Sequence, residues 1–172
     1  MPDLGPVISE YLKNLAKAAN APGAAPELSL RPSLDKLLQD VIKLLQRQNQ
    51  FHLVNEGTTA GVKGRPDFIL LYHESPNGYV EAESIDSNLK KLTGHAKVQN
   101  DHYCANLDNF LLTNHLDFQL WHEGKRIATA TLPDPRSGFA IPTEREIFDL
   151  THLLDRFFGS PNVTLPALKA PK

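Results

Sequence analysis

The chain has 172 residues, a formal net charge of -2, and 41% hydrophobic and 22% charged residues, as expected of one globular domain with a substantial core. No apolar run approaches the roughly 20 residues of a membrane-spanning helix, and the first residues lack the pattern of a signal peptide, so we expect a cytoplasmic protein outside membranes. The single cysteine, Cys104, excludes an internal disulfide and a thiolate-rich zinc site. Proteins that bind nucleic acid by themselves usually carry an excess of Lys and Arg. With its net charge of -2, this chain would need another protein or domain to bring it to DNA.

The first part of the chain is predicted to be helical. Apolar residues recur at helical spacing over residues 7–20, and an Asn-Ala-Pro-Gly sequence ends this helix. The strongest helical pattern follows over residues 32–45, where Leu, Val and Ile form a broad apolar stripe. We expect residues 1–50 to form N-terminal helices that pack on a core made by residues 51–159.

The predicted core alternates between strands and helices. Short apolar or alternating runs predict strands, and longer runs with helical spacing predict helices. The predicted strands cover residues 51–55, 67–72, 78–83, 109–113, 117–121 and 126–132, the helices residues 93–105 and 143–158, and turns fall at 76–78, 114–115 and 123–125. This order predicts an α/β sandwich with a mixed β-sheet flanked by helices. Residues 160–172 contain three prolines and no apolar periodicity, and we interpret them as a linker or tail.

Three carboxylates lie on one predicted hairpin. Asp67 begins its first strand, and Glu81 and Glu83 share one face of the second because side chains alternate along a strand. Carboxylates that converge repel one another, so a hard cation or a shared proton is the economical explanation. Two further acids could join them or simply be solvated: Glu56 opens a glycine-rich loop, and Glu27 precedes the second helix.

Several short motifs follow one another in order between residues 29 and 132. They are Leu30-Arg31-Pro32, Asn55-Glu56, Gly64-Arg65-Pro66-Asp67-Phe68, Gly78-Tyr79-Val80-Glu81-Ala82, Gln99 with Tyr103, Asn109 to Asn114, and Leu116-Asp117-Phe118. Together they resemble the PD-(D/E)xK nuclease superfamily. The resemblance is greatest to the nuclease domain at the N-terminus of fused restriction-modification enzymes, in which an adenine-specific DNA methyltransferase follows.

The resemblance implies a restriction-endonuclease-like fold and a DNA endonuclease that depends on Mg²⁺, with Mn²⁺ as a substitute. In this family the metal is held at the positions of Asp67, Glu81 and the main-chain carbonyl of Ala82. Gln99, with Tyr103, matches a helix motif that supports the site in some branches, so we include it among the catalytic candidates. The implied partners are DNA and a methyltransferase or specificity region, in cis or in trans. Cutting both strands needs two active sites, so we also expect a dimer on DNA.

Glu83 departs from the family pattern, which has Lys at this place. Replacing Lys with Glu changes the charge at this position by two units. At ~4 Å and an effective dielectric near 20, the electrostatic energy of a neighbouring charge then changes by on the order of several kcal/mol. Glu83 could be a further metal ligand or a general base, which favours a two-metal scheme. Alternatively, a basic residue elsewhere could supply the missing charge, and the candidates are Lys63, Lys90, Lys91 and Lys97. As a third possibility, the domain is catalytically inactive and serves DNA contact or assembly with a methyltransferase.

Overall fold

The computed structural model describes residues 2–23, 26–55, 65–138 and 140–159. Several residues considered above lie outside this part of the chain: Glu56 and Lys63 in the loop, the side chain of Glu27, and the tail over residues 160–172. Their predicted roles are not addressed by the structure.

The described residues form five helices and six strands. These are α1 (Gly5–Ala19), α2 (Pro26–Ser29), α3 (Arg31–Leu44), β1 (Phe51–Asn55), β2 (Phe68–Tyr72), β3 (Ser75–Ala82), α4 (Gly94–Asn106), β4 (Phe110–Thr113), β5 (Asp117–His122), β6 (Lys125–Thr131) and α5 (Glu144–Phe157). The strands make one sheet in the order β1-β2-β3-β4-β5-β6. Neighbouring strands are antiparallel except β3 and β4, which run parallel and are joined through α4. This confirms the predicted α/β sandwich with a mixed sheet and is consistent with a restriction-endonuclease-like fold.

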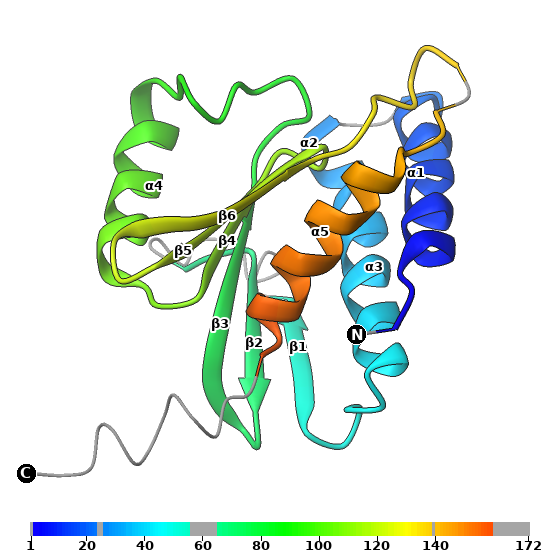
Figure 1. Ribbon diagram of the computed structural model, residues 1–172. Coiled ribbons are helices and arrows are strands. Elements are labelled where there is room, and N and C mark those ends of the chain that lie inside the picture. The colour runs from blue at the N-terminus through cyan, green and yellow to red at the C-terminus, as the bar shows by residue number, and fades with distance from the viewer. Residues whose placement is uncertain (1, 24–25, 56–64, 139, 160–172) are drawn as a thin grey trace, which may run out of the picture.

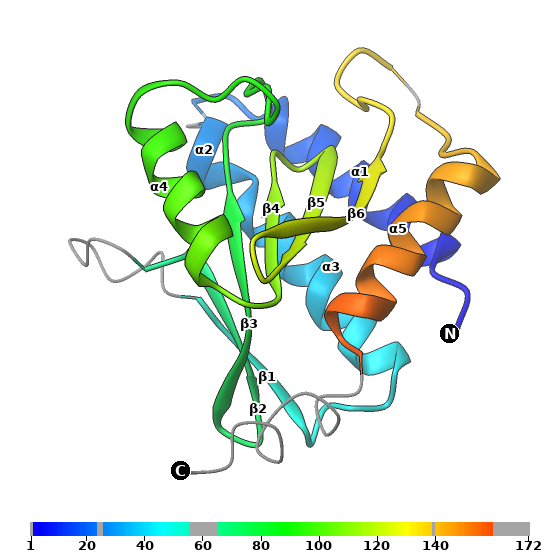
Figure 2. The same ribbon diagram turned by 60° about the vertical axis from the view of Figure 1, so that its left-hand side comes forward.

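Helices cover both faces of the sheet (Figures 1 and 2). On one face, α1, α3 and α5 bury a large hydrophobic core against the strands, and Val80 lies in this core. On the other face, α4 packs over a smaller apolar cluster of Leu89, Tyr103, Phe110 and Leu112. Because side chains alternate along β3, the neighbour of Val80, Glu81, points to the face that α4 covers.

The N-terminal helices belong to the large core. Helix α1 buries Ile8, Tyr11, Leu12 and Leu15, and these side chains lie in the same apolar cluster as the strand residues. The hydroxyl of Tyr11 donates a 2.8 Å hydrogen bond to the carbonyl of His115, in the turn between β4 and β5. Helix α1 is therefore connected to the sheet by apolar packing and by a buried polar contact.

The turn between β2 and β3 differs from the prediction. The prediction placed it at residues 76–78, but the chain turns at His73 and Glu74, which both have positive φ (46° and 68°), and β3 already begins at Ser75. Pairing continues from Leu71 opposite Pro76 to Leu70 opposite Gly78, with an irregularity that accommodates the extra residue. The Pro-Asn-Gly sequence thus forms a bulged strand.

Tertiary packing explains why Gly78 lies in a strand. A Cβ atom at this position would lie 2.8 Å from a ring carbon of Phe157 and 2.9 Å from the amide nitrogen of Asn109. That amide donates to the carbonyl of Asn77 (2.9 Å) and to that of Phe157 (2.9 Å). The glycine therefore permits the close approach of α5 to β3, which no local pattern reveals.

Candidate active site

Asp67 and Glu81 are brought together by the pairing of β2 with β3. Asp67 precedes the first residue of β2, and Phe68 pairs with Val80, so the acid meets Glu81 across the hairpin. The backbone N–H of Asp67 donates to Oε2 of Glu81 (3.1 Å), and the backbone N–H of Ala82 donates to Oδ2 of Asp67 (2.9 Å). Both acids are buried, with 7% and 8% exposure. The main chain thus fixes both carboxylates at one place and sets Ala82 beside them.

The buried position of Glu81 disfavours its ionised form. The pKa of Glu81 is raised to about 8, chiefly by burial and then by the negative charges of Asp67 and Glu83, while the backbone hydrogen bond from Asp67 and the charge of Arg31 oppose the increase. A carboxyl with this pKa is protonated over much of the neutral range unless a cation stabilises its charge. The arrangement has the electrostatic character of a site for a cation or for a shared proton.

Arg31 is the basic side chain that lies against this pair. It is the first residue of α3, and its Nη2 lies 2.8 Å from Oδ1 of Asp67. Its side chain keeps 20% of its surface exposed, whereas that of Asp67 keeps 9%. Sequence reasoning placed Arg31 in a motif but gave it no role, because nothing local indicates that the start of α3 reaches the hairpin.

Glu83 lies just beyond β3, and a side chain of α4 holds it. Its backbone N–H donates to the carbonyl of Thr113 (2.8 Å), and its Oε1 accepts a hydrogen bond from Nδ2 of Asn100 (2.7 Å). Asn100 is 2% exposed and also donates to the carbonyl of Ala96 (2.9 Å), while its Oδ1 finds no hydrogen-bond partner in the described part of the chain. Sequence reasoning missed Asn100, which lies next to Gln99 in the helix.

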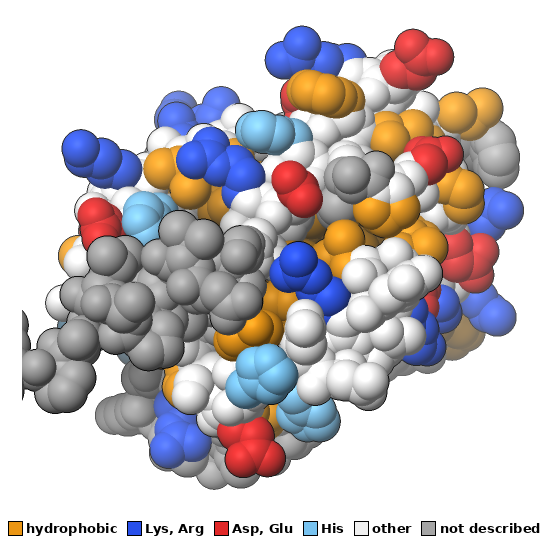
Figure 3. Space-filling model, turned by 60° about the horizontal axis from the view of Figure 1, so that its bottom comes forward, with side chains coloured by type: hydrophobic (Ala, Val, Ile, Leu, Met, Phe, Trp, Pro, Cys, Tyr) orange, Lys and Arg blue, Asp and Glu red, His pale blue; other side chains and the backbone are white. Residues whose placement is uncertain are grey.

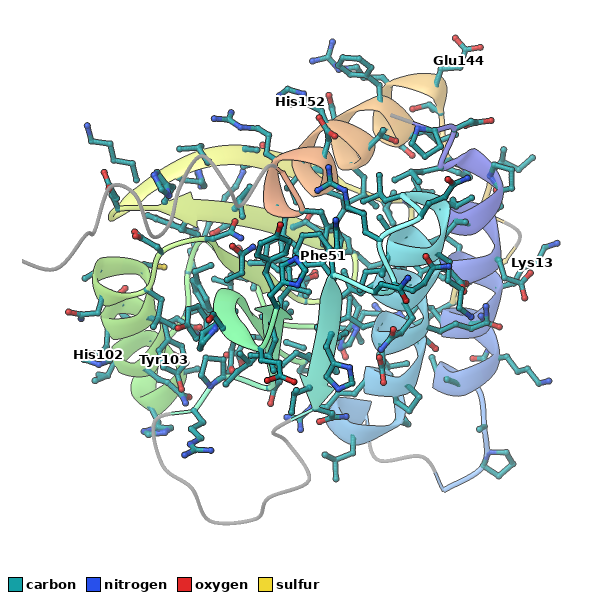
Figure 4. All side chains as sticks on the ribbon, turned by 90° about the horizontal axis from the view of Figure 1, so that it is seen from below. Lys13, Phe51, His102, Tyr103, Glu144 and His152 are labelled. Carbon is teal, nitrogen blue, oxygen red and sulfur yellow. The ribbon has the colours of Figure 1, made fainter. Side chains whose placement is uncertain are left out.

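Gln99 and Tyr103 interact one helical turn apart, as their spacing predicts. Nε2 of Gln99 donates to the hydroxyl of Tyr103 at 2.9 Å. Figure 4 shows Tyr103 on the side of α4 that faces the sheet and His102 on the outer side. Burial raises the pKa of Tyr103, the hydrogen bond from Gln99 lowers it, and the charges of Glu81 and Asp67 raise it again. The Gln99-Tyr103 pair therefore lies within electrostatic reach of the carboxylates.

Among the lysines proposed as replacements for the family Lys, the three in the described part of the chain do not pair with the carboxylates of the site. Lys97 forms a 2.6 Å ion pair with Asp101 on α4, and the side chains of Lys90 and Lys91 are exposed. Lys63 lies outside the described residues. Arg31, a residue that was not among the candidates, does form an ion pair with Asp67 of the site.

The possible metal ligands at this site are few. In the described part of the chain, no three His, Cys, Asp or Glu side chains are grouped so that they could hold a metal ion. The structure brings Asp67 and Glu81 together, whereas Glu83 turns to Asn100. Mg²⁺ usually takes one or two carboxylates and completes its shell with waters and substrate oxygens, so this pair, with the adjacent main chain of Ala82, fits Mg²⁺. The assignment of Glu83 as a ligand stays a prediction.

Charged side chains are mixed on the face that Figure 3 shows. Lys and Arg, Asp and Glu, His and apolar side chains alternate there, in keeping with the net charge of -2. Among the helices in the described ranges, none is long and apolar enough to cross a bilayer.

Comparisons with known proteins identify the fold. No protein-family model matches the chain, and no curated protein matches it. Among solved structures, the chain is similar to a protein in the cryo-EM structure of a DrdV-DNA complex, with a TM-score of 0.64 and 16% sequence identity. The match covers 92% of this chain and 14% of that one, so this chain spans a small part of the other protein. At this identity the match shows that the two share a fold.

Proposed function

We propose that the chain is the nuclease domain of a restriction-modification system and hydrolyses DNA phosphodiesters with Mg²⁺. The observation that carries the proposal is the buried pair of Asp67 and Glu81, held together by two backbone hydrogen bonds although their charges repel. Such a pair has a use if a cation neutralises it. The fold shared with a protein from a DNA complex supports DNA as the substrate.

In this proposal, Asp67 and Glu81 would hold Mg²⁺ through their carboxylates, and the main chain of Ala82 would add a carbonyl. The bound ion would supply positive charge to polarise the scissile phosphate, to lower the pKa of a water and to neutralise the leaving oxygen. Loss of the Glu81 proton accompanies ion binding, because the pKa of this group is raised to about 8 in the metal-free protein. Gln99 and Tyr103, which are joined by a hydrogen bond on α4, would support the site from that helix.

In this proposal, Glu83 acts as the general base for the attacking water or as a ligand of a second cation. Oε1 accepts from Asn100, which orients the carboxylate and leaves Oε2 available as a base or ligand. A carboxylate of this kind acts on the water where a Lys would instead stabilise charge. Asn100 is then a positioning residue.

DNA is delivered by other parts of the assembly. A net charge of -2, with charges of both signs mixed on the face in Figure 3, gives little non-specific affinity for phosphates. A methyltransferase or specificity region, in cis or in trans, supplies this affinity, and a dimer on DNA supplies the second active site.

The test measures cutting of plasmid DNA with Mg²⁺ or Mn²⁺, by the chain alone and by any longer protein that contains it. Asp67→Asn and Glu81→Gln are expected to abolish cutting and metal binding, measured by calorimetry. Glu144→Gln, which changes an exposed acid at the start of α5, is the control and should cut normally. Absence of cutting by every form of the wild-type protein, with either metal, would refute the proposal.

A second candidate is a catalytically inactive module that contacts DNA or assembles with a methyltransferase. It is favoured by one observation: Oδ1 of Asp67 is engaged by Arg31, so the carboxylate already has a cationic partner. This candidate predicts that Glu83→Lys, which restores the family pattern, creates metal-dependent nicking that the wild-type chain lacks. Nicking by the wild-type chain would exclude it.

A further inference from the structure

A phosphodiester adds negative charge to a site that already contains three acids. Asp67 and Glu81 lie together, and the charge of Glu83 is close enough to raise the pKa of Glu81. A positive charge fixed in the protein would lower the cost of bringing phosphate to these acids. Arg31 places such a charge at the site, through its ion pair with Asp67.

Only some of the hydrogen-bond donors of the Arg31 guanidinium have partners among the described residues. Nη2 contacts Oδ1 of Asp67 at 2.8 Å, while Nε is buried and finds no hydrogen-bond partner among the described residues. A guanidinium carries five N–H donors in a fixed fork, and a buried donor without a partner is unfavourable. The side chain is 20% exposed, so part of it reaches the protein surface. This contact leaves Arg31 with unused capacity for an oxyanion.

His115 is a second side chain with unpaired hydrogen-bonding atoms, and the charge of Arg31 acts on it. His115 is fully buried, and neither of its ring nitrogens has a hydrogen-bond partner within the described ranges. Burial first, and the charge of Arg31 second, lower the pKa of His115 to about 4, so the imidazole is neutral and within electrostatic reach of the guanidinium. A buried, neutral imidazole without a hydrogen-bond partner among the described residues thus lies within electrostatic reach of Arg31.

We propose that Arg31 is the protein's own cation at this site. It neutralises Asp67 in the metal-free protein, and it contacts a non-bridging oxygen of the DNA phosphate once Asp67 is occupied by the metal. This inference rests on the proposed nuclease function and gives the site the fixed positive charge that Glu83 does not supply. Arg suits the role because its planar fork binds carboxylate and phosphate alike.

The first test is metal binding without DNA. Arg31 and the metal compete for Oδ1 of Asp67, so Arg31→Gln is expected to bind Mg²⁺ about tenfold more tightly in calorimetry, while Arg31→Lys stays near wild type. A residue that only holds Asp67 in place would have the opposite effect, since its loss would weaken binding. Unchanged or weaker Mg²⁺ binding by Arg31→Gln would overturn the proposal.

The second test is DNA cutting at saturating Mg²⁺. Arg31→Gln is expected to cut about 100-fold more slowly, because a group that binds the phosphate is lost, and Arg31→Lys is expected to retain part of the rate. Arg136→Gln is the matched control: its guanidinium pairs with Asp86 at 2.7 Å outside the site, so both metal affinity and cutting should be unchanged. A wild-type rate for Arg31→Gln would overturn the proposal.

A measurement on the wild-type protein covers the case in which Arg31→Gln does not fold. The Nε–H signal of Arg31 in ¹⁵N NMR, assigned with Arg31→Lys, is expected to shift when Mg²⁺ is added, because the guanidinium leaves Asp67. An unmoved signal in protein that binds Mg²⁺ would overturn the inference and leave the nuclease proposal standing. Wild-type protein that neither binds Mg²⁺ nor cuts DNA would refute both.

Discussion

Asp67 and Glu81 illustrate how a main chain can hold like charges together. Each carboxylate accepts a backbone N–H from the opposite strand, so the same ladder that pairs β2 with β3 also fixes the acids. This arrangement makes ionisation of Glu81 unfavourable, and the pKa of its carboxyl is raised to about 8. The sequence predicted that these two acids share a hairpin, whereas the register that sets Asp67 beside Glu81 follows from the turn at His73 and Glu74, which was not predicted. The contacts of Arg31 and Asn100 depend on helix packing and could not be predicted from local patterns.

The raised pKa of Glu81 predicts a pH dependence of stability in metal-free protein. Native Glu81 keeps its proton up to about pH 8, whereas the unfolded side chain loses it near pH 4.5, so the free energy of unfolding should fall as pH rises between these values. Glu81→Gln should remove this part of the slope, measured by urea denaturation in EDTA. Glu144→Gln is the control. A slope of wild-type size in Glu81→Gln would assign it to other groups.

His115 predicts a dependence of opposite sign. Its native pKa is lowered to about 4 from 6.5, so the unfolded state binds more protons in this window, and stability should be lost as pH falls from 6.5 towards 4. The loss should reach about 3 kcal/mol at the acid end. His115→Asn tolerates the local φ of 79° and should flatten this part of the profile. An unchanged difference between pH 4 and pH 7 would show that His115 does not titrate as expected.

At the scale of elements, most strands and helices could be predicted because their apolar patterns are local. The turn at Asn114 and His115 is confirmed, and Oδ1 of Asn114 accepts from the N–H groups of Leu116 (3.0 Å) and Asp117 (2.6 Å). The turn at residues 76–78 was wrong, because Pro-Asn-Gly is a strong turn signal and its use in a bulged strand depends on α5. Tertiary contact there overrides local preference.

Gly78→Ala tests this explanation. A methyl group would lie 2.8 Å from a ring carbon of Phe157, so we expect a loss of about 1–3 kcal/mol in the free energy of unfolding. Gly5→Ala is the matched control, because its Cβ would meet only the movable carboxylate of Asp3 at 3.1 Å and the end of Ile147 at 3.7 Å. Urea denaturation of both variants measures the difference. Equal stabilities would show that α5 and β3 yield easily at this contact.

At the scale of the whole molecule, the N-terminal helices are part of the main core. The buried side chains of α1 and α3 lie in the same cluster as Val80, Leu111 and Phe118 from the sheet. The site depends on them as well, because Arg31 begins α3. Residues 1–50 therefore help to cover one face of the sheet, and they supply Arg31, the positive charge that pairs with Asp67.

A fragment of residues 51–159 tests this dependence. Without α1 and α3, the apolar side chains of the sheet that they cover would meet water, so we expect the fragment to lack a cooperative unfolding transition. Thermal and urea denaturation followed by near-ultraviolet circular dichroism provide the measurement, with the full chain as the reference. A cooperative transition in the fragment would contradict the expectation.

The parallel pairing of β3 with β4 also bears on the order of folding. The hairpin of β2 and β3 joins residues that are close in the chain, whereas β4 can pair only after the crossover through α4 has closed a longer loop. We therefore expect Asp67 and Glu81 to meet early in folding, while water still surrounds them and before Arg31 or Asn100 packs against them. Repulsion between the two acids opposes this first step. Added salt screens it, and the folding rate of the chain should increase with ionic strength.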